Sequence, residues 1–204
     1  MRLNRLEFAL MNNPLRAAIQ RYVEAPQLLQ MGGVMSGGRA LELGCGRGVG
    51  TELILDVFKA ERVDAFDLDP RMVALARKRL VPRGSKAHLW VGDATAIPVL
   101  SGTYDAVFDF GIIHHISQWR QALREVTRVL KLGGRFYAEE VLARFINHPI
   151  MKRLLDHPRA DRFDALSFRA GLTEAGLLQH KSRQFVGAIG WFTASRATSG
   201  PTRR

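Results

Sequence analysis

The sequence predicts an α/β fold: a doubly wound, mostly parallel sheet of seven strands with helices on both faces, preceded by an N-terminal helical extension. Three observations predict it. From residue 39 on, short apolar runs alternate with segments of helical periodicity, which is typical of a parallel sheet. A glycine-rich turn joins the first of these runs to the first helix. Acidic residues follow the next two runs, at the sheet edge where such folds bind ligands.

The chain divides into three parts. Its 204 residues suffice for one good core, so we expect an N-terminal extension over 1–38, a single domain over 39–198 and a disordered tail over 199–204. The apolar runs are too short to span a bilayer, and the N-terminus lacks a cleavable leader. The single cysteine, Cys45, excludes an intrachain disulfide. We therefore expect a cytoplasmic protein.

The extension is expected to be helical. Pro14 suits a first helical turn with Asn12 or Asn13 as its cap, and apolar residues then recur at helical spacing. This apolar stripe consists of Leu15, Ala18, Ile19, Tyr22 and Val23, with Arg16, Gln20, Arg21 and Glu24 off it. Residues 1–11 are both apolar and basic, so they could cover an active-site cleft or lie on an anionic membrane; their short length favours the cover. Breaks are expected at Pro26, Gly32-Gly33 and Gly37-Gly38.

The remaining elements follow in order. Strands are expected near 40–43, 62–67, 88–91, 104–110, 135–141, 181–186 and 188–195. Helices are expected near 51–58, 70–81, 119–130 and 167–175, with a loop or helical segment over 144–164. Asp69-Pro70 predicts a capped helix start, and Gly133-Gly134 predicts the end of the third helix.

The glycine-rich turn reads Gly44-Cys45-Gly46-Arg47-Gly48, with Glu42 two residues before it. Glycine adopts positive φ freely and lets a ligand lie against bare backbone, and the start of the next helix favours electronegative groups. A dinucleotide-binding turn would need a small residue where Val49 stands, which disfavours a nicotinamide oxidoreductase. The alternative interpretation is an ordinary tight turn of an α/β protein that binds no ligand. Cys45 is expected to be a small filler rather than a nucleophile.

Acidic residues at the next two strand ends suit a nucleoside. Asp67 ends the second strand, where a carboxylate can accept hydrogen bonds from both hydroxyls of a ribose. The other role open to it, capping the next helix, suits Asp69 better. Asp93 follows the third strand in Val91-Gly92-Asp93-Ala94, and taken alone it could be an ordinary strand-end residue.

Together these motifs resemble those of the class I S-adenosylmethionine-dependent methyltransferases, which have a Rossmann-like sheet, over about residues 39–142. The resemblance implies S-adenosyl-L-methionine as cofactor, S-adenosyl-L-homocysteine as product, and no metal. It assigns the ribose to Asp67, the adenine to Leu68, Asp93 and Ala94, and the border of the methionine part to Asp109 and Gly111. The cofactor turn would consist of Glu42, Gly44, Cys45, Gly46 and Gly48.

Candidate catalytic residues follow the fourth and fifth strands. His114 and His115 could serve as a base for a hydroxyl acceptor, because imidazole titrates near neutral pH. Glu139, next to Glu140, could bind a cationic or hydroxylated acceptor. One histidine could equally pack or cap, and one of the two glutamates must point away, since side chains alternate along a strand. The prediction is His115, His114 and Glu139.

The net charge of +11 is concentrated at the two flanks. Residues 41–140 hold 14 Lys and Arg against 13 Asp and Glu, whereas residues 1–40 hold 5 against 2 and residues 141–204 hold 11 against 4. Such flanks suit a phosphate-bearing partner, namely an anionic lipid surface, a nucleic acid or an acidic small molecule. A solvated surface is the equally weighted alternative.

The resemblance extends to the small-molecule branch, which includes quinone-biosynthesis and phospholipid methyltransferases. Asp109-Phe110-Gly111-Ile112 departs from the Asn/Asp-Pro-Pro-aromatic motif of the branch that methylates DNA and protein amino groups, and no Pro-Cys pair suits cytosine C5 attack. We therefore expect a small, quinone-like or lipid-like acceptor, contacted by the N-terminal helices and 144–164, with peripheral contact on an anionic membrane. An RNA methyltransferase and a non-catalytic binding module are the alternatives. The methylated atom and the oligomeric state stay open.

Overall fold

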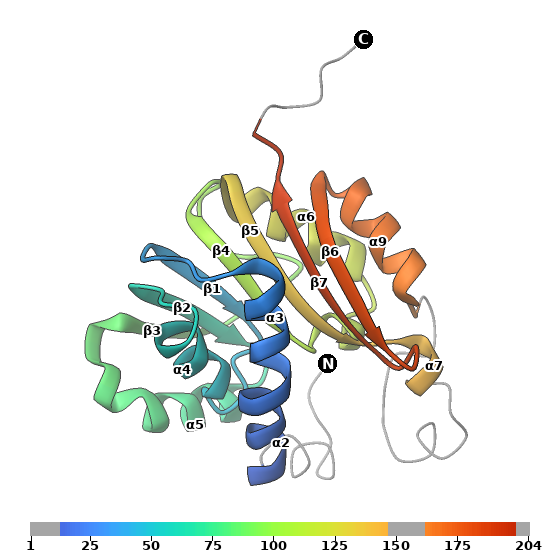
Figure 1. The fold of residues 1–204 in the computed structure, drawn as a ribbon. Helices are drawn as coiled ribbons and strands as arrows, with labels where there is room; N and C mark the ends of the chain where they lie inside the picture. Colours follow the sequence, from blue (N-terminus) through green and yellow to red (C-terminus); the bar gives the residue numbers. More distant parts are fainter. Residues whose placement is uncertain (1–12, 147–161, 199–204) are drawn as a thin grey trace.

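A computed structural model describes residues 13–146 and 162–198 of the chain (Figure 1). The amphipathic segment 1–11, Asn12, most of the segment 144–164 and the tail 199–204 lie outside the described residues. Within the described part, no helix has the length and apolar character needed to cross a membrane.

One sheet of seven strands organises the described part of the chain. Its strand order is β3-β2-β1-β4-β5-β7-β6, in which β1 to β5 are parallel and β7 runs antiparallel between β5 and β6. This confirms the mostly parallel, doubly wound fold. The strands are β1 (Arg39–Leu43), β2 (Arg62–Asp67), β3 (Ala87–Val91), β4 (Tyr104–Phe110), β5 (Leu130–Val141), β6 (Leu177–Phe185) and β7 (Ile189–Arg196). The order reverses between β1 and β4, which is where such sheets open a crevice.

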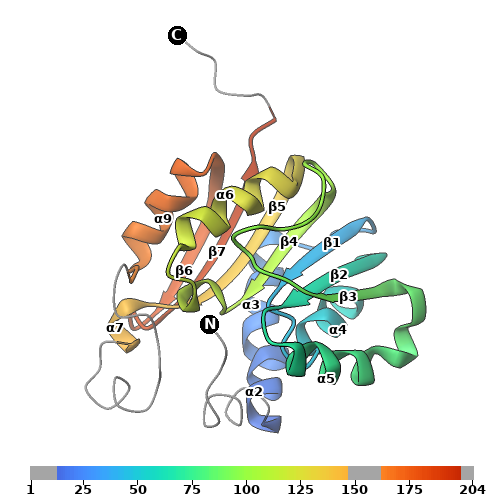
Figure 2. The same ribbon diagram turned by 180° about the vertical axis from the view of Figure 1, so that it is seen from behind.

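Helices cover both faces of the sheet, as predicted (Figures 1 and 2). On one face, α3 (Ala25–Gly32), α4 (Val49–Asp56) and α5 (Pro70–Leu80) enclose a core around Phe58, Phe108 and Tyr137. On the other, α6 (Trp119–Val129) and α9 (Ala165–Glu174) enclose a core around Trp119 and Phe168. Short helical segments complete the fold: α2 (Pro14–Ile19), η1 (Gln20–Glu24), η2 (Val81–Lys86), η3 (Ile113–His115) and α7 (Ala143–Ile146).

The predicted stop of the third helix at Gly133-Gly134 is wrong. Helix α6 ends at Val129 and the chain turns directly into β5, whose first residue, Leu130, is buried and pairs with Tyr104 of β4. The two glycines lie within the irregular start of that strand. Strand pairing and burial of Leu130 outweigh the local glycine signal. Strand β6 likewise begins four residues earlier than expected, because Leu177 pairs with Arg196 of β7.

The start of the N-terminal helix is confirmed, but the predicted break at Pro26 is wrong. The Arg16 N–H donates to the Asn13 side chain at 2.8 Å, which caps α2. The chain then continues through the π-helical turn η1 into α3 without leaving helical conformation. Pro26 stands in the first turn of α3, directly after the π-helical turn η1.

The orientation of α2 and η1 is the reverse of what their apolar stripe suggests. Leu15 and Tyr22 are 68% and 75% exposed, and Ile19 and Val23 are exposed as well. Arg16, Gln20 and Glu24 instead face the body of the protein, on the opposite side of the helix. This side of the helix borders the cavity, and Arg16 finds an ion-pair partner there in Glu24 at 2.6 Å.

Candidate cofactor site

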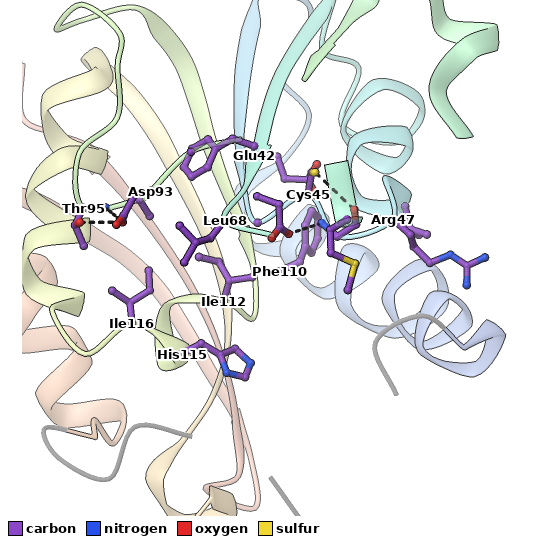
Figure 3. Close-up of a pocket in the computed structure, with 18 of the residues that line it drawn as sticks. Glu42, Cys45, Arg47, Leu68, Asp93, Thr95, Phe110, Ile112, His115 and Ile116 are labelled. Carbon is purple, nitrogen blue, oxygen red and sulfur yellow. Dashed lines mark hydrogen bonds between the residues drawn. The ribbon is translucent and has the colours of Figure 1, made fainter. Parts of the chain in front are cut away.

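A cavity of about 550 Å³ lies at the carboxyl ends of β1, β2, β3 and β4 and is bordered by α2 and η1 (Figure 3). That size is within the range of about 300–1,000 Å³ typical of small-molecule sites. The carboxyl ends of parallel strands carry the turns whose backbone groups are not used by the sheet, so ligand contacts collect there.

The glycine turn forms one wall of this cavity. Gly44, Cys45 and Gly46 line it, and the turn is held to β2 because the Cys45 N–H donates to the Phe66 carbonyl at 2.8 Å. Gly44 has a φ of +67°, and a Cβ there would lie 2.4 Å from Ile112 Cγ2, so no other residue fits. Gly48 does not line the cavity; it begins α4 in left-handed conformation. Burial raises the pKa of the Cys45 thiol, as expected of a filler rather than a nucleophile.

Asp67 lines the cavity with a fixed carboxylate. Its Oδ2 accepts the Gly46 N–H at 3.0 Å, and its Oδ1 accepts the Asp69 N–H at 2.9 Å. Burial raises its pKa, and these two hydrogen bonds counteract part of that effect. Asp69 caps α5 through the Arg71 N–H, so the capping role falls to Asp69 as predicted. Leu68, between them, also lines the cavity.

Asp93 and Ala94 lie in the cavity wall after β3. The Asp93 Oδ1 accepts hydrogen bonds from both the N–H and the hydroxyl of Thr95, each at 2.8 Å (Figure 3). Ala94 is buried and offers a small apolar surface. In Figure 3, Asp93 and Thr95 lie at one end of the cavity, away from Glu42 and Cys45.

Glu42 is a buried carboxyl in the cavity wall at the end of β1. It is 1% exposed, and the Thr51 hydroxyl donates to its Oε2. Burial raises the pKa of Glu42 to about 8, and the charges of Asp67 and Asp109 act in the same direction. A cation placed in this part of the cavity would therefore stabilise the ionised form.

The structure places Asp109 and Gly111 behind the cavity wall, whereas Phe110 and Ile112, which alternate with them, line it. Asp109 is fully buried, and its Oδ1 accepts the Ile112 N–H at 2.9 Å. Burial and the neighbouring Glu140 raise its pKa well above the usual value. Gly111 has a φ of +79°, and a Cβ there would lie 3.1 Å from a Glu139 oxygen. These two residues shape the turn rather than contact its contents.

The two histidines take different places. His115 lines the cavity, whereas His114 turns inward, where its Nδ1 lies 2.5 Å from Glu140 Oε2. The two rings contact each other with 4.2 Å between centroids. Glu140 also accepts the Ile113 N–H at 2.7 Å, so it organises the whole turn η3. The prediction missed Glu140, although its place next to Glu139 on a strand implies opposite faces.

Glu139 is fully buried on the α2 side of the sheet and does not line the cavity. Its Oε2 lies 4.0 Å from Arg16 Nη2. Burial raises its pKa well above the usual value, and the nearby charge of Glu24 adds to this while Arg16 opposes it. The structure thus places Glu139 behind Arg16 rather than beside a bound molecule.

Several residues of the cavity wall were not predicted. Arg16 and Gln20 reach it from α2 and η1, and Ile116, Ser117 and Gln118 reach it from the segment after η3. The spacing of Arg16, Gln20 and Glu24 by four residues was a signal for one polar helix face. Among residues 13–146 and 162–198, no group of three or more His, Cys, Asp or Glu is arranged to hold a metal.

Comparison with known proteins connects this geometry to a family. Residues 40–134 match the family model described as "Methyltransferase domain". The chain is 33% identical over 118 residues to malonyl-[acyl-carrier protein] O-methyltransferase of Serratia marcescens, covering 58% of this chain and 44% of that protein. It is 35% identical over 104 residues to human mitochondrial 2-methoxy-6-polyprenyl-1,4-benzoquinol methylase, covering 50% of this chain and 31% of that one. The chain thus spans less than half the length of either relative.

Solved structures agree at the level of the fold. A chain of the structure titled "Complex between the Haloferax volcanii Trm112 methyltransferase activator and the putative methyltransferase" superposes with a TM-score of 0.80 at 17% identity, covering 97% of this chain and 99% of that chain. The region matched by the family model contains the glycine turn, Asp67, Asp93 and the turn after β4, which together form most of the cavity wall. Residues 40–134 thus match a methyltransferase domain, and these relatives together with the fold support a class I S-adenosylmethionine-dependent methyltransferase.

Proposed function

We propose that this protein transfers a methyl group from S-adenosyl-L-methionine to a small acceptor that has a lipid-like or quinone-like part, with S-adenosyl-L-homocysteine as the second product. One observation carries the proposal: Glu42, Asp67 and Asp93 approach one cavity from the ends of three neighbouring strands. A nucleoside with an amino-acid tail presents ammonium, hydroxyl and amino donors, and carboxylates are strong acceptors for all three.

The residues present fit this cofactor. Each oxygen of Asp67 accepts one backbone N–H, and an ionised carboxylate has about four acceptor positions, so both oxygens can still accept a ribose hydroxyl. Leu68 and Ala94 offer apolar surface for a purine, with Asp93 at its polar edge. The backbone of Gly44, Cys45 and Gly46 can approach a ligand closely because the glycines carry no side chain.

The bound cofactor would supply a methyl group on a sulfonium, which is already activated for transfer. The chain's own work is then to orient the acceptor in line and to exclude water. His115, in the cavity wall, can accept the proton of a hydroxyl acceptor. His114 contacts the ring of His115 and would help to hold it in place. Glu139 would likewise help to position Arg16.

The acceptor side of the cavity supports an amphiphilic molecule. Ile112 and Ile116 lie near His115 in Figure 3 and give this part of the wall an apolar surface. The two relatives named above act, by their names, on a polyprenyl benzoquinol and on a malonyl group carried by a protein. Both are reactive head groups on a larger carrier. This favours a small head group over an RNA strand as the part that enters the cavity.

The exposed stripe of α2 and η1 supports contact with a membrane surface. Leu15, Ile19, Tyr22 and Val23 lie on the outer face of the same helical turns whose inner face borders the cavity. The basic flanks would add attraction to an anionic lipid surface. An amphiphilic acceptor could then reach the cavity directly from the membrane.

Isothermal titration calorimetry with S-adenosyl-L-homocysteine tests the proposal. We expect the wild type to bind one equivalent, Asp67→Ala to abolish binding, and Asp56→Asn to bind normally, because Asp56 pairs with Arg83 and does not line the cavity. Transfer of radiolabelled methyl from the cofactor into a lipid extract then identifies the acceptor. A folded wild type that does not bind S-adenosyl-L-homocysteine would overturn the proposal.

A further inference from the structure

We infer that the turn of the β6–β7 hairpin inserts into an anionic lipid surface, with Phe185 and Val186 as the apolar contact and Arg144 beside them as the contact for lipid phosphate. This is a second membrane contact, in a different part of the chain from the exposed stripe of α2 and η1. It rests on the peripheral membrane contact in the proposed function, and not on the identity of the cofactor or the acceptor.

The turn holds an apolar residue in an unfavourable backbone conformation. Val186 and Gly187 have φ values of +51° and +65°, and the Ala188 N–H donates to the Phe185 carbonyl at 2.9 Å. Positive φ at both central positions is typical of a type I′ turn, which favours Asn, Asp or Gly there. A β-branched residue is an outlier in this conformation. Val186 is therefore not explained by the needs of the turn.

The apolar side chains of the turn are in contact with water. Phe185 and Val186 are 62% and 65% exposed, and Phe145 of the neighbouring α7 is exposed as well. The Leu142 N–H, directly before α7, donates to the Ala188 carbonyl at 2.8 Å and so holds the two segments together. Apolar side chains gathered at the end of a hairpin gain free energy when they leave water for a lipid surface.

The charges around the turn suit an anionic surface. Arg144 is exposed, and a Cβ at Gly187 would lie 3.3 Å from its Cδ, so its side chain lies beside the turn. Lys181 and Arg183 of β6 are exposed too, and the sequence has no Asp or Glu after Glu174. The hairpin thus carries positive and no negative side chains. Apolar residues with cations beside them are the combination that binds anionic lipid.

The turn lies at the edge of the sheet that holds the cavity. Val141, the last residue of β5, pairs with Ile189, which pairs with Phe185, so the turn extends just beyond the carboxyl end of β5. The cavity lies at the carboxyl ends of β1 to β4. Figures 1 and 2 show the hairpin turn, α7 and α2 along this same edge. Two contacts on one edge bind a surface more tightly than either alone, because the second binds after the first has fixed the protein there.

The surroundings of the turn favour a lipid surface over a second copy of the chain. Strand β6 lies at the edge of the sheet, where another strand could pair with it. Lys181 and Arg183 on this strand disfavour such pairing. Two exposed side chains also bury far less than the roughly 1,000 Å² of a specific protein interface. Insertion into lipid has no such minimum area.

Co-sedimentation with vesicles of equal parts phosphatidylcholine and phosphatidylglycerol tests the inference. We expect Phe185→Asp to weaken binding to these vesicles at least about tenfold, the factor that corresponds to burial of one such side chain. Arg144→Gln should weaken it about fivefold, the factor for one basic residue near such a surface. Leu178→Asp, at an exposed position at the other end of β6, is the matched control and should bind as the wild type does.

Two further variants separate lipid contact from folding. Asparagine tolerates the left-handed conformation, so Val186→Asn should raise the melting temperature by about 2–4 °C while it weakens vesicle binding. Phe185→Trp keeps an apolar side chain and should bind as the wild type does. Its added fluorescence, relative to the wild-type spectrum, should shift to shorter wavelength when the vesicles are added. If Phe185→Asp does not fold, these two variants decide.

Undiminished vesicle binding by Phe185→Asp or Val186→Asn would overturn the inference. So would a wild-type dimer that Phe185→Asp dissociates without any vesicle binding, since the turn would then be an interface between copies. Calorimetry with S-adenosyl-L-homocysteine on the same preparations separates the two proposals. A wild type that binds the nucleoside but not anionic vesicles overturns this inference alone. A wild type that binds the vesicles but not the nucleoside refutes the proposed methyl transfer and supports the membrane contact.

Discussion

His114 Nδ1 lies 2.5 Å from Glu140 Oε2, which ties the turn after β4 to the end of β5. The same carboxyl accepts the backbone N–H groups of Ile113 and His114. One buried side chain therefore holds both the conformation of the turn and the ring of His114. His115 follows directly, with its ring against that of His114 and its surface in the cavity wall.

Glu140→Gln is expected to impair methyl transfer more than cofactor binding. The amide keeps an oxygen for the Ile113 N–H but cannot hold His114 as the carboxyl does, so His115 loses its support. Small misplacements of a catalytic group lower rates by roughly ten- to a hundredfold. Methyl transfer and S-adenosyl-L-homocysteine binding should be measured on the same preparation. If the loss in His115→Ala and the loss in Glu140→Gln simply add in the double variant, the two residues act independently and this prediction is wrong.

The stability of the empty protein is expected to fall with rising pH because of Glu42. Its pKa is raised by burial to about 8, so the folded state holds a proton that the unfolded chain releases near its ordinary pKa. The contribution is fully present below the unfolded pKa and is lost as pH rises through the folded value. Glu42→Gln should therefore flatten the pH dependence of unfolding between about pH 4.5 and 8. Urea unfolding at several pH values measures this, and an unchanged slope would contradict it.

The variants Gly44→Ala and Gly46→Ala, in the same turn, should differ in their effect on the free energy of folding. Gly44→Ala places a Cβ 2.4 Å from Ile112 at a φ of +67°, so we expect a loss of roughly 2 kcal/mol or more of folding free energy. Gly46→Ala meets no atom within 4 Å and should lose only about 1 kcal/mol, the penalty of its positive φ.

Because Gly46 lines the cavity, its alanine variant should instead weaken cofactor binding. Thermal melting gives the first comparison and titration with S-adenosyl-L-homocysteine gives the second. Gly46→Ala with normal affinity would show that the ligand does not lie against this part of the turn.

The double variant Leu15→Asp, Tyr22→Asp should lose membrane contact without a change in the cavity. Both side chains are exposed on the outer face of α2 and η1, and a charge there opposes insertion into a lipid surface. We expect the wild type to co-sediment with anionic vesicles more than with neutral ones, and the double variant with neither. Leu100→Asp, at an 84% exposed position that does not line the cavity, is the matched control. Equal recovery of wild type and double variant would exclude the stripe as a membrane contact.

Much of the fold and part of the candidate site could be predicted because the signals are local. The alternation of apolar runs with helical segments depends on neighbouring residues, and so do the glycines of the turn. Asp67 and Asp93 could be placed at one edge because parallel strands bring their carboxyl ends together. The family followed from these motifs in combination.

The remaining residues of the site depend on contacts between segments far apart in the chain. Arg16 and Gln20 reach the cavity because α2 and η1 border it beside the end of β4, and no local pattern says which side of an amphipathic helix meets a cavity. The apolar stripe pointed to the wrong face for this reason. Similarly, the sequence does not say whether Glu139 or Glu140 contacts His114, because this depends on which face of β5 the turn after β4 occupies.

The sequence by itself determined the succession of strands and helices along the chain, the glycine turn and the acidic strand ends, because backbone preference and side-chain periodicity are properties of short segments. Only the tertiary structure decided that Arg16 faces the cavity, that Asp109 lies behind its wall and that Glu140 holds His114. Those outcomes follow from burial, which requires each charged group in the interior to find a partner that the folded chain alone brings within reach.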